Sequence, residues 1–305
     1  MNAPNFIIAG APKCGSTTLF RYLNPHNDVF FPKIKEPGFM IKEYYQALSK
    51  DSPNYQRQLE YLVLDELKYS QLYDEVDNKI LGDSSISYLF QYENAIENIL
   101  KYCGRDTKIL FILREPVSRL KSQYQYIREL GFENQELRKA LELEEYRLSE
   151  NWSSIFAYKQ QGLYAEGIKA FMEVFEHIHV MFFEELIADP TGQMEKVYQF
   201  LGISSNKLDE DLTFNKSGIP RNRAVHKFLM TKNPLRSVFA KLMRFFISED
   251  RLLLIRDKLR GMNQRKNSGI EISDSLEANL KDFYKKDHKE LERLLGRALP
   301  WNCPV

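Results

Sequence analysis

Cysteine is scarce in this sequence, and no stretch of it is long and apolar enough to cross a membrane. Three of the 305 residues are cysteine, at positions 14, 103 and 303. This odd number and wide spacing exclude a disulfide framework and a zinc-finger pattern, and they favour a reducing compartment. The first residues lack the basic stretch and apolar core of a signal peptide, and no apolar run reaches the roughly 18 residues of a membrane span. We therefore expect a soluble, cytoplasmic protein without a transmembrane segment.

An excess of charge of either sign is also missing. Lys and Arg number 43 and Asp and Glu number 42, which gives a formal net charge of +1. Proteins that bind nucleic acid or other polyanions usually carry a clear basic excess, because they neutralise many phosphates. The balance argues against a nucleic acid partner, so any anion must be bound locally. With 43% apolar and 13% aromatic residues, the chain has enough apolar side chains for a folded core.

Short apolar runs alternate with segments of helical periodicity along the first two thirds of the chain. We predict strands at residues 5–9, 79–82, 108–113 and 179–183. We predict helices at residues 94–102, 117–130, 162–175 and 190–201, and a final helix that starts with a capping box at 274–277 and ends at Gly296. Strands separated by helices favour right-handed βαβ units, and thus an α/β fold with a central parallel sheet flanked by helices.

The most specific local pattern follows the first predicted strand. Gly10 and Gly15 enclose four residues, Ser16 to Thr18 complete the loop, and a predicted helix follows at residues 19–23. The backbone amides of such a loop and helix N-terminus can cradle a phosphate. A nucleotide triphosphatase would have Lys at position 16, whereas the lysine of this loop is Lys13. Asp83, after the second predicted strand, could still hold magnesium, so a P-loop kinase remains an alternative, as does an ordinary strand–helix turn.

The C-terminal third has a different charge pattern. Between Lys232 and Lys266 there are ten Lys or Arg residues and three acidic ones, a local net charge of +7. Apolar residues recur at helical spacing within the same stretch. A solvated helix face over a core stripe explains this pattern, and a positive rim for an anionic ligand or a membrane surface is the alternative.

Three motifs lie in the same order as in one enzyme family. They are Pro12-Lys13-Cys14-Gly15-Ser16-Thr17-Thr18-Leu19, Lys33-Ile34-Lys35-Glu36-Pro37-Gly38-Phe39 and Arg114-Glu115-Pro116-Val117-Ser118-Arg119-Leu120-Lys121-Ser122-Gln123-Tyr124. Shorter fragments at 82–88, 162–164, 183–190 and 215–221, and Trp301, extend the match over nearly the whole chain. The sequence resembles the sulfotransferases that use 3′-phosphoadenosine 5′-phosphosulfate (PAPS), above all the branch that acts on carbohydrates, including the heparan sulfate enzymes.

The resemblance implies a fold and a donor site. The fold would be a single domain over residues 1–305, P-loop-like and three-layered, with a helical, basic segment at about 230–300. Arg114 and Ser122 would bind the 3′-phosphate of PAPS, because Arg offers a planar fork and Ser one further hydrogen bond. The other implied donor-binding residues are Lys13, Gly15, Ser16, Thr17, Thr18, Lys216, Gly218 and Arg221. No metal is implied.

The resemblance also implies a catalytic side. Glu36 matches the family's catalytic base, with Lys35 beside it, and Lys13 would stabilise the charge on the leaving oxygen. The candidate contacts to the acceptor are Asp83, Ser85 and Tyr88. The acceptor would be a hydroxyl group of a glycan or of a small molecule such as a secondary metabolite.

The match to the heparan sulfate enzymes departs at two places on the acceptor side. Gly38 stands where they have a polar residue or histidine, and Asp83-Ser84-Ser85 replaces their Glu-Lys-Ser. Both changes leave the donor residues intact and leave the identity of the acceptor open. A non-catalytic nucleotide-binding protein on the same fold is a third alternative.

Overall fold

The computed structural model describes residues 2–74, 76–77, 79–208, 219–220, 264–265 and 270–301. Contacts group the chain into two compact units, of which the first comprises residues 1–123, 136–213 and 272–305. The second unit comprises residues 124–135 and 214–271. The single domain expected from the sequence stays a prediction.

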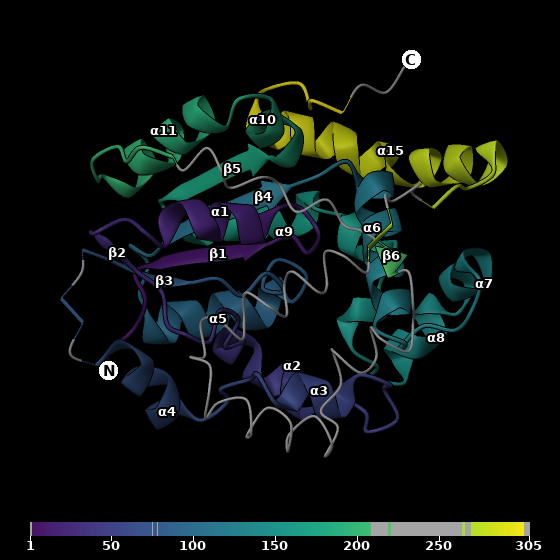
Figure 1. The fold of residues 1–305 in the computed structure, drawn as a ribbon, viewed down its shortest axis with the longest axis horizontal. Coiled ribbons are helices and arrows are strands. Elements are labelled where there is room, and N and C mark those ends of the chain that lie inside the picture. Colours follow the sequence, from purple (N-terminus) through teal and green to yellow (C-terminus); the bar gives the residue numbers. More distant parts are fainter. Residues whose placement is uncertain are drawn as a thin grey trace. The chain divides into compact units, whose positions relative to one another are not determined.

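A five-stranded parallel sheet forms the centre of the first unit (Figure 1). In spatial order the strands are β2 (Val29–Phe30), β3 (Ile80–Asp83), β1 (Phe6–Gly10), β4 (Lys108–Leu113) and β5 (Ile178–Phe182). In β1, Ile7 lies opposite Asp83 on one side and Ile109 on the other. Apart from Lys108, β1 and β4 are entirely buried, which explains why they occur in the sequence as continuous apolar runs. The predicted α/β class with a central parallel sheet is confirmed.

The position of β1 decides where a ligand can bind. The chain starts the sheet at β1, adds β3 on one side of it and then crosses over to add β4 on the other side. The carboxyl ends of these three strands therefore meet where the strand order reverses, which is the crevice in which open α/β sheets bind ligands. The glycine loop leaves the sheet from this end of β1.

Helices lie on both sides of the sheet in Figure 1. The longer helices are α1 (Ser16–Leu23), α5 (Tyr92–Tyr102), α6 (Pro116–Glu129), α9 (Ala165–Val174), α11 (Pro190–Leu201) and α15 (Asp274–Leu295). The short ones are α2 (Lys42–Gln46), α3 (Tyr55–Leu59), α4 (Glu66–Ser70), α7 (Leu137–Glu142), α8 (Glu144–Ser149) and α10 (Phe183–Ala188). Single 3-10 turns occur at η1 (Phe39–Ile41), η2 (Gln71–Tyr73), η3 (Ser154–Phe156) and η4 (Gln160–Gly162). Helix α9 packs against α5 and α15, and α11 packs against β5.

The second unit is described only in part. It contains the C-terminal end of α6, where Tyr124 Oη donates a hydrogen bond to Gln135 O at 2.8 Å. It also contains an antiparallel pair of two-residue strands, β6 (Ile219–Pro220) and β7 (Gln264–Arg265). Apart from these two β7 residues, the basic segment from Lys232 to Lys266 lies outside the described residues.

The predicted elements are present, with ends shifted by at most three residues. The sequence analysis missed β2, because a strand of two residues is too short for periodicity to show. The predicted start of the last helix was wrong in one detail. Ser273 is the N-cap of α15, and its Oγ accepts a hydrogen bond from Leu276 N at 3.3 Å. The predicted ends at Gly202 and Gly296 are confirmed, since both residues have the positive φ of a helix C-cap.

Helix α15 is joined to the sheet domain by a side chain that caps another helix. Asp287 accepts hydrogen bonds from Tyr164 N at 3.0 Å and Ala165 N at 2.9 Å, at the N-terminal end of α9. Tyr284 Oη donates to Lys159 O at 3.0 Å one turn earlier in α15. Burial raises the pKa of Asp287. The last helix therefore supplies the acceptors that α9 lacks.

Replacing Asp287 with Ala should destabilise the protein, because two amide groups at the start of α9 lose their acceptor. We expect a loss of about 1–3 kcal/mol in the free energy of unfolding, measured by urea denaturation. Glu290→Gln is the matched control, since Glu290 on the same helix pairs with Arg293 through exposed side chains; it should change stability little. Equal effects of the two substitutions would show that Asp287 does not anchor α15.

Candidate functional site

The glycine loop leads into the N-terminus of α1, whose N-cap residue has no side chain. Gly15 is the N-cap of α1 with φ of +94°, and among the described residues no side chain caps this helix. A Cβ at position 15 would lie 2.6 Å from Cδ2 of Phe183, so the position requires glycine for space as well as for φ. Thr18 N donates to Gly15 O at 2.9 Å. The amides of Ser16 and Thr17 precede this bond and have no acceptor within the helix, so they can receive an anion.

A second helix, α6, begins nearby, and a side chain directly before it caps its N-terminus. Glu115 precedes α6, and its carboxylate accepts from Val117 N at 2.9 Å and from Ser118 N at 2.6 Å. Glu115 N in turn donates to Glu184 Oε1 at 3.0 Å. The N-terminus of α6 is therefore neutralised by a carboxylate, whereas that of α1 keeps its positive partial charge. Of these two helix ends, only that of α1 can bind an anionic ligand.

The structure brings Arg114 to the glycine loop from the end of β4. Its Nη1 donates to Lys13 O at 3.3 Å, and its guanidinium lies over the ring of Phe183 at 4.7 Å. Tyr164 Oη holds the backbone there by donating to Arg114 O at 2.9 Å. The loop that carries Lys13 and the predicted 3′-phosphate residue Arg114 are thus one connected surface. Ser122 is half-buried on α6 and, within the described part of the chain, has no hydrogen bond to Arg114.

Lys35 and Glu36 reach the same loop from the segment after β2. Lys35 Nζ donates to Thr17 Oγ1 at 3.2 Å and pairs with Glu36 Oε1 at 3.4 Å. The side chains are 25% and 43% exposed, so Glu36 remains open to a second molecule while Lys35 is largely enclosed. The predicted base and the predicted donor loop are therefore linked through a single lysine.

The three candidate acceptor contacts are buried and bind one another. Asp83 accepts from Tyr69 Oη at 2.8 Å, from Ser85 Oγ at 2.6 Å and from Tyr88 Oη at 2.9 Å. Burial raises the pKa of Asp83 to about 6, the three hydrogen bonds oppose this, and the charge of Glu36 adds to it. Acceptor binding by Asp83, Ser85 and Tyr88 stays a prediction; the described bonds make these residues an internal support.

Three residues around the site had been given no role from the sequence, although Tyr164 and Phe183 lie in the matched fragments at 162–164 and 183–190. Phe183 and Tyr164 support Arg114 and the glycine loop, and Tyr69 supports Asp83. The place of Phe183, directly after β5, was foreseeable because carboxyl ends of parallel strands share one edge. Tyr69 lies on a short helix without a recognisable motif, so no feature of the neighbouring sequence predicted its bond to Asp83.

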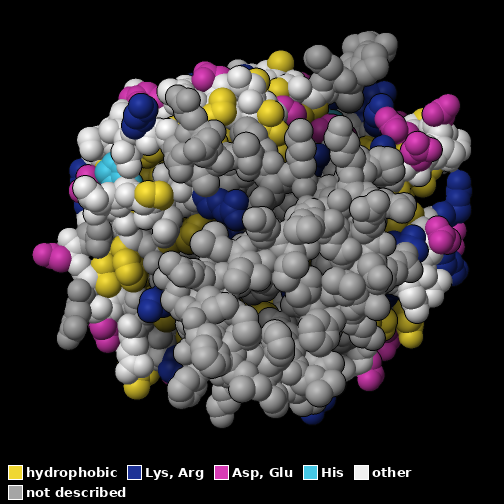
Figure 2. Space-filling view, in the orientation of Figure 1, with side chains coloured by type: hydrophobic (Ala, Val, Ile, Leu, Met, Phe, Trp, Pro, Cys, Tyr) yellow, Lys and Arg dark blue, Asp and Glu magenta, His cyan; other side chains and the backbone are white. Residues whose placement is uncertain are grey.

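Three predicted donor residues, Lys216, Gly218 and Arg221, lie outside the described residues. Within the described ranges, no group of three or more His, Cys, Asp or Glu side chains is placed to hold a metal ion. No helix in the part of the chain that the structure describes is long and apolar enough to span a membrane. On the face seen in Figure 2, the described basic and acidic side chains are mixed around the edge, and one group of basic side chains lies near the centre without a described acidic side chain beside it.

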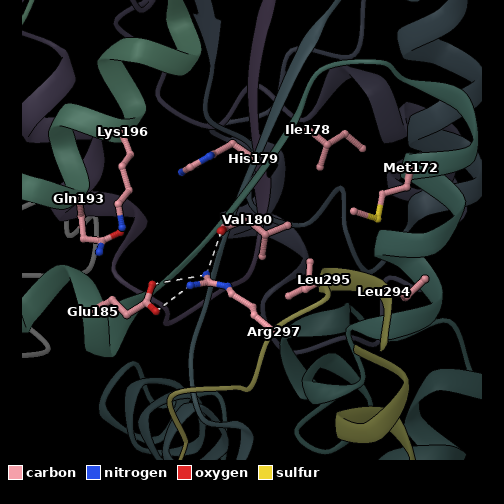
Figure 3. Close-up of a pocket in the computed structure, with 10 residues that line it drawn as sticks. All are labelled: Met172, Ile178, His179, Val180, Glu185, Gln193, Lys196, Leu294, Leu295 and Arg297. Atoms are coloured by element: carbon pink, nitrogen blue, oxygen red, sulfur yellow. Dashed lines mark hydrogen bonds and ion pairs between the residues drawn. The ribbon is translucent and has the colours of Figure 1, made fainter. Parts of the chain in front are cut away.

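A pocket of about 300 Å³ lies elsewhere, along the edge strand β5. Figure 3 shows His179 and Lys196 on one side of it and Met172 on the other, and the ion pair of Arg297 and Glu185, at 2.8 Å, lies below His179 and Lys196 in this view. None of the predicted site residues lines this pocket. The residues of the candidate site lie instead at the carboxyl ends of β1, β3 and β4 and in the segments that follow them.

Comparison with known proteins identifies the family of this chain. The family described as "Sulfotransferase domain" matches residues 3–228, so the chain belongs to the sulfotransferase family. Carbohydrate sulfotransferase 15 of Rattus norvegicus is 25% identical over 288 residues, which cover 80% of this chain and 51% of that protein. Heparan sulfate glucosamine 3-O-sulfotransferase 3A1 of Mus musculus is 26% identical over 231 residues, covering 71% and 50%.

A solved structure agrees over almost the full length. The sulfotransferase from Alicyclobacillus acidocaldarius superposes with a TM-score of 0.73 at 26% identity, covering 98% of both chains. The predicted family, enzyme class and fold are thereby confirmed. The chain spans about half the length of the curated relatives it matches.

The buried Asp83 should leave a signature in the pH dependence of stability. Its pKa rises from 3.8 to about 6 on folding, so the folded protein binds more protons than the unfolded chain between these values. Stability from this group is therefore greatest at low pH and is lost as pH rises through about 6. From pH 4 to pH 7, wild-type protein should lose on the order of 2–3 kcal/mol relative to Asp83→Asn.

The difference in unfolding free energy between wild type and Asp83→Asn, measured with urea from pH 4 to pH 7, reports on Asp83. All other titratable groups are present in both proteins, so their contributions cancel. Parallel stability curves would show that the carboxyl group titrates normally in the folded protein.

Proposed function

We propose that this protein transfers the sulfuryl group of PAPS to a hydroxyl group of a carbohydrate or secondary metabolite. The observation that carries the proposal is the position of Lys35, whose Nζ lies 3.2 Å from Thr17 Oγ1 and 3.4 Å from Glu36 Oε1. A phosphate-binding loop and a partly exposed carboxylate are thereby held side by side. That arrangement suits a reaction in which one substrate loses a proton while the other develops negative charge.

The donor-binding groups fit a nucleotide with two anionic ends. The uncapped N-terminus of α1 and Lys13 would hold the 5′-phosphosulfate. Arg114, fixed over Phe183, would offer its planar guanidinium to the 3′-phosphate, with Ser122 as a further donor. Bound PAPS supplies the sulfuryl group and a nucleotide phosphate as leaving group.

The chain's own residues account for the proton and for the charge. The oxygen of the acceptor hydroxyl forms the new bond to sulfur, and Glu36 takes the proton that this hydroxyl loses. The bond between sulfur and the 5′-phosphate oxygen breaks, and its electron pair leaves with 3′-phosphoadenosine 5′-phosphate (PAP). Lys13, Lys35 and the first amides of α1 stabilise the negative charge that grows on this oxygen, an effect worth about two to three powers of ten in rate per donor.

The acceptor is proposed from the relatives and from the charge balance. The names of the curated relatives identify them as carbohydrate and heparan sulfate sulfotransferases, which supports a glycan hydroxyl for this chain. A net charge of +1 favours an acceptor with few charges over a densely sulfated polymer. The cytoplasmic location remains a prediction.

PAP should bind and stabilise the protein without a metal. At 100 times its Kd, PAP should add about 2.7 kcal/mol to the free energy of unfolding in a thermal-shift assay. Arg114→Ala should weaken PAP binding about 10- to 100-fold by calorimetry, because a charge-assisted bond to phosphate is lost. Lys121→Ala is the matched control, since Lys121 lies on α6 next to Ser122 but pairs with Glu277 at 3.6 Å. Stabilisation by ATP with magnesium and not by PAP would favour the kinase alternative and contradict the proposal.

Glu36→Gln should abolish transfer and leave PAP affinity nearly unchanged, because the amide cannot take the acceptor proton. Turnover should fall by about two to four powers of ten. It is measured with radiolabelled PAPS and a panel of heparan sulfate oligosaccharides, chondroitin oligosaccharides and aryl alcohols. Glu93→Gln, which alters an exposed carboxylate at the start of α5, is the control. Wild-type turnover in Glu36→Gln would remove Glu36 from the mechanism.

A further inference from the structure

A buried carboxylate, that of Asp83, is connected through two successive sets of hydrogen bonds to the loop that follows Glu36. Asp83 is completely buried, and its two oxygens accept from the hydroxyl groups of Tyr69, Ser85 and Tyr88. Each hydroxyl proton is thus directed towards Asp83, which leaves the hydroxyl oxygen free to accept a bond from another group. In this way a charge in the interior orients several neutral side chains.

Two of these hydroxyl oxygens hold the loop that follows Glu36. Ser85 Oγ accepts from Gly38 N at 3.1 Å, and Tyr88 Oη accepts from Met40 N at 3.2 Å. On the other side of the loop, Asn98 Nδ2 donates to Met40 O at 3.1 Å. Tyr69 differs from Ser85 and Tyr88, because its hydroxyl group bonds to Asp83 but to no amide of this loop.

The loop transmits this position to Glu36 over a short, stiff connection. Pro37 fixes its own φ and restricts Glu36 to extended conformations. Pro37 O also accepts from Val63 N at 2.9 Å. A Cβ on Gly38 would lie 2.6 Å from Tyr45 and 2.7 Å from Leu62, so side chains pack closely against the backbone at this position. The place of the Glu36 side chain is therefore tied to the amides of Gly38 and Met40.

We propose that Asp83 is a positioning residue for transfer: through Ser85 and Tyr88 it fixes the 38–40 backbone and so holds the Glu36 carboxylate beside the donor loop. The proposal rests on the proposed function of Glu36 as the base. It assigns to Asp83, Ser85 and Tyr88 a role behind the reacting atoms, without contact to the acceptor. A displacement of a reacting group by about 1 Å can cost 100-fold in rate, so a support of this kind affects turnover more than binding.

The test compares two tyrosines that each donate one bond to Asp83. Tyr88→Phe deprives Met40 N of its acceptor and should lower kcat about 10- to 100-fold. Tyr69→Phe, the matched control, removes an equivalent bond but leaves the loop amides paired, and should change kcat less than about 3-fold. PAP affinity should stay within about twofold in both variants. Ser85→Ala, which removes the acceptor of Gly38 N, serves in place of Tyr88→Phe if that variant does not fold or bind PAP. Wild-type kcat in both Tyr88→Phe and Ser85→Ala overturns the proposal.

A double-mutant cycle with Glu36→Asp distinguishes positioning from direct contact. The assay uses the most active acceptor of the panel described above, and Glu36→Asp keeps a carboxylate at a shifted place. If Tyr88 acts through Glu36, the double variant should be slowed far less than the product of the two single effects. If the effects of Tyr88→Phe and Glu36→Asp on turnover multiply in the double variant, and Tyr88→Phe raises the KM of the acceptor, the positioning role is overturned. Glu36 would still be the base in that case. Wild-type turnover in Glu36→Asp and Glu36→Gln would instead refute the base, and the positioning role with it.

Discussion

The proposed donor site depends on one helix N-terminus that has no described side-chain cap. Helix α1 starts at a glycine and has no side-chain cap among the described residues, so its first amides keep their positive partial charge. The neighbouring helix α6 shows the opposite arrangement, with Glu115 bonded to its first amides. The first amides of α6 are bonded to a carboxylate, whereas within the described part of the chain those of α1 are not, and this difference leaves the N-terminus of α1 available to an anion. Lys13, Lys35 and Arg114 add a few placed cations to this end.

The position of β1 inside the sheet turns this local feature into a site. Because β3 and β4 flank β1, residues that follow neighbouring strands lie at the same edge of the sheet as the glycine loop. Arg114 arrives from β4, Asp83 from β3 and Phe183 from the end of β5. The chain therefore needs no general basic excess to bind an anionic donor, which agrees with its net charge of +1.

The two sides of the crevice follow different physical rules. The proposed donor side consists of backbone amides and cations at the glycine loop. Behind the acceptor side lies a buried carboxylate that neutral hydroxyl groups surround, and its charge is tolerated because three bonds satisfy it. Such a network is costly to leave half-satisfied, so it keeps the backbone near Glu36 in one arrangement.

By itself, the sequence determined what depends on consecutive residues: the alternation of strands and helices, the glycine loop between β1 and α1, and the spacing of Arg114 and Ser122 along one strand–helix unit. Only the tertiary structure decided that Lys35 bonds to Thr17 and that Asp83 lies buried behind the loop of Glu36. Residues that follow one another keep their geometry wherever the element is placed. Burial and the choice of hydrogen-bond partner depend instead on which distant segments meet. The periodicity of apolar residues along the sequence does not show which segments these are.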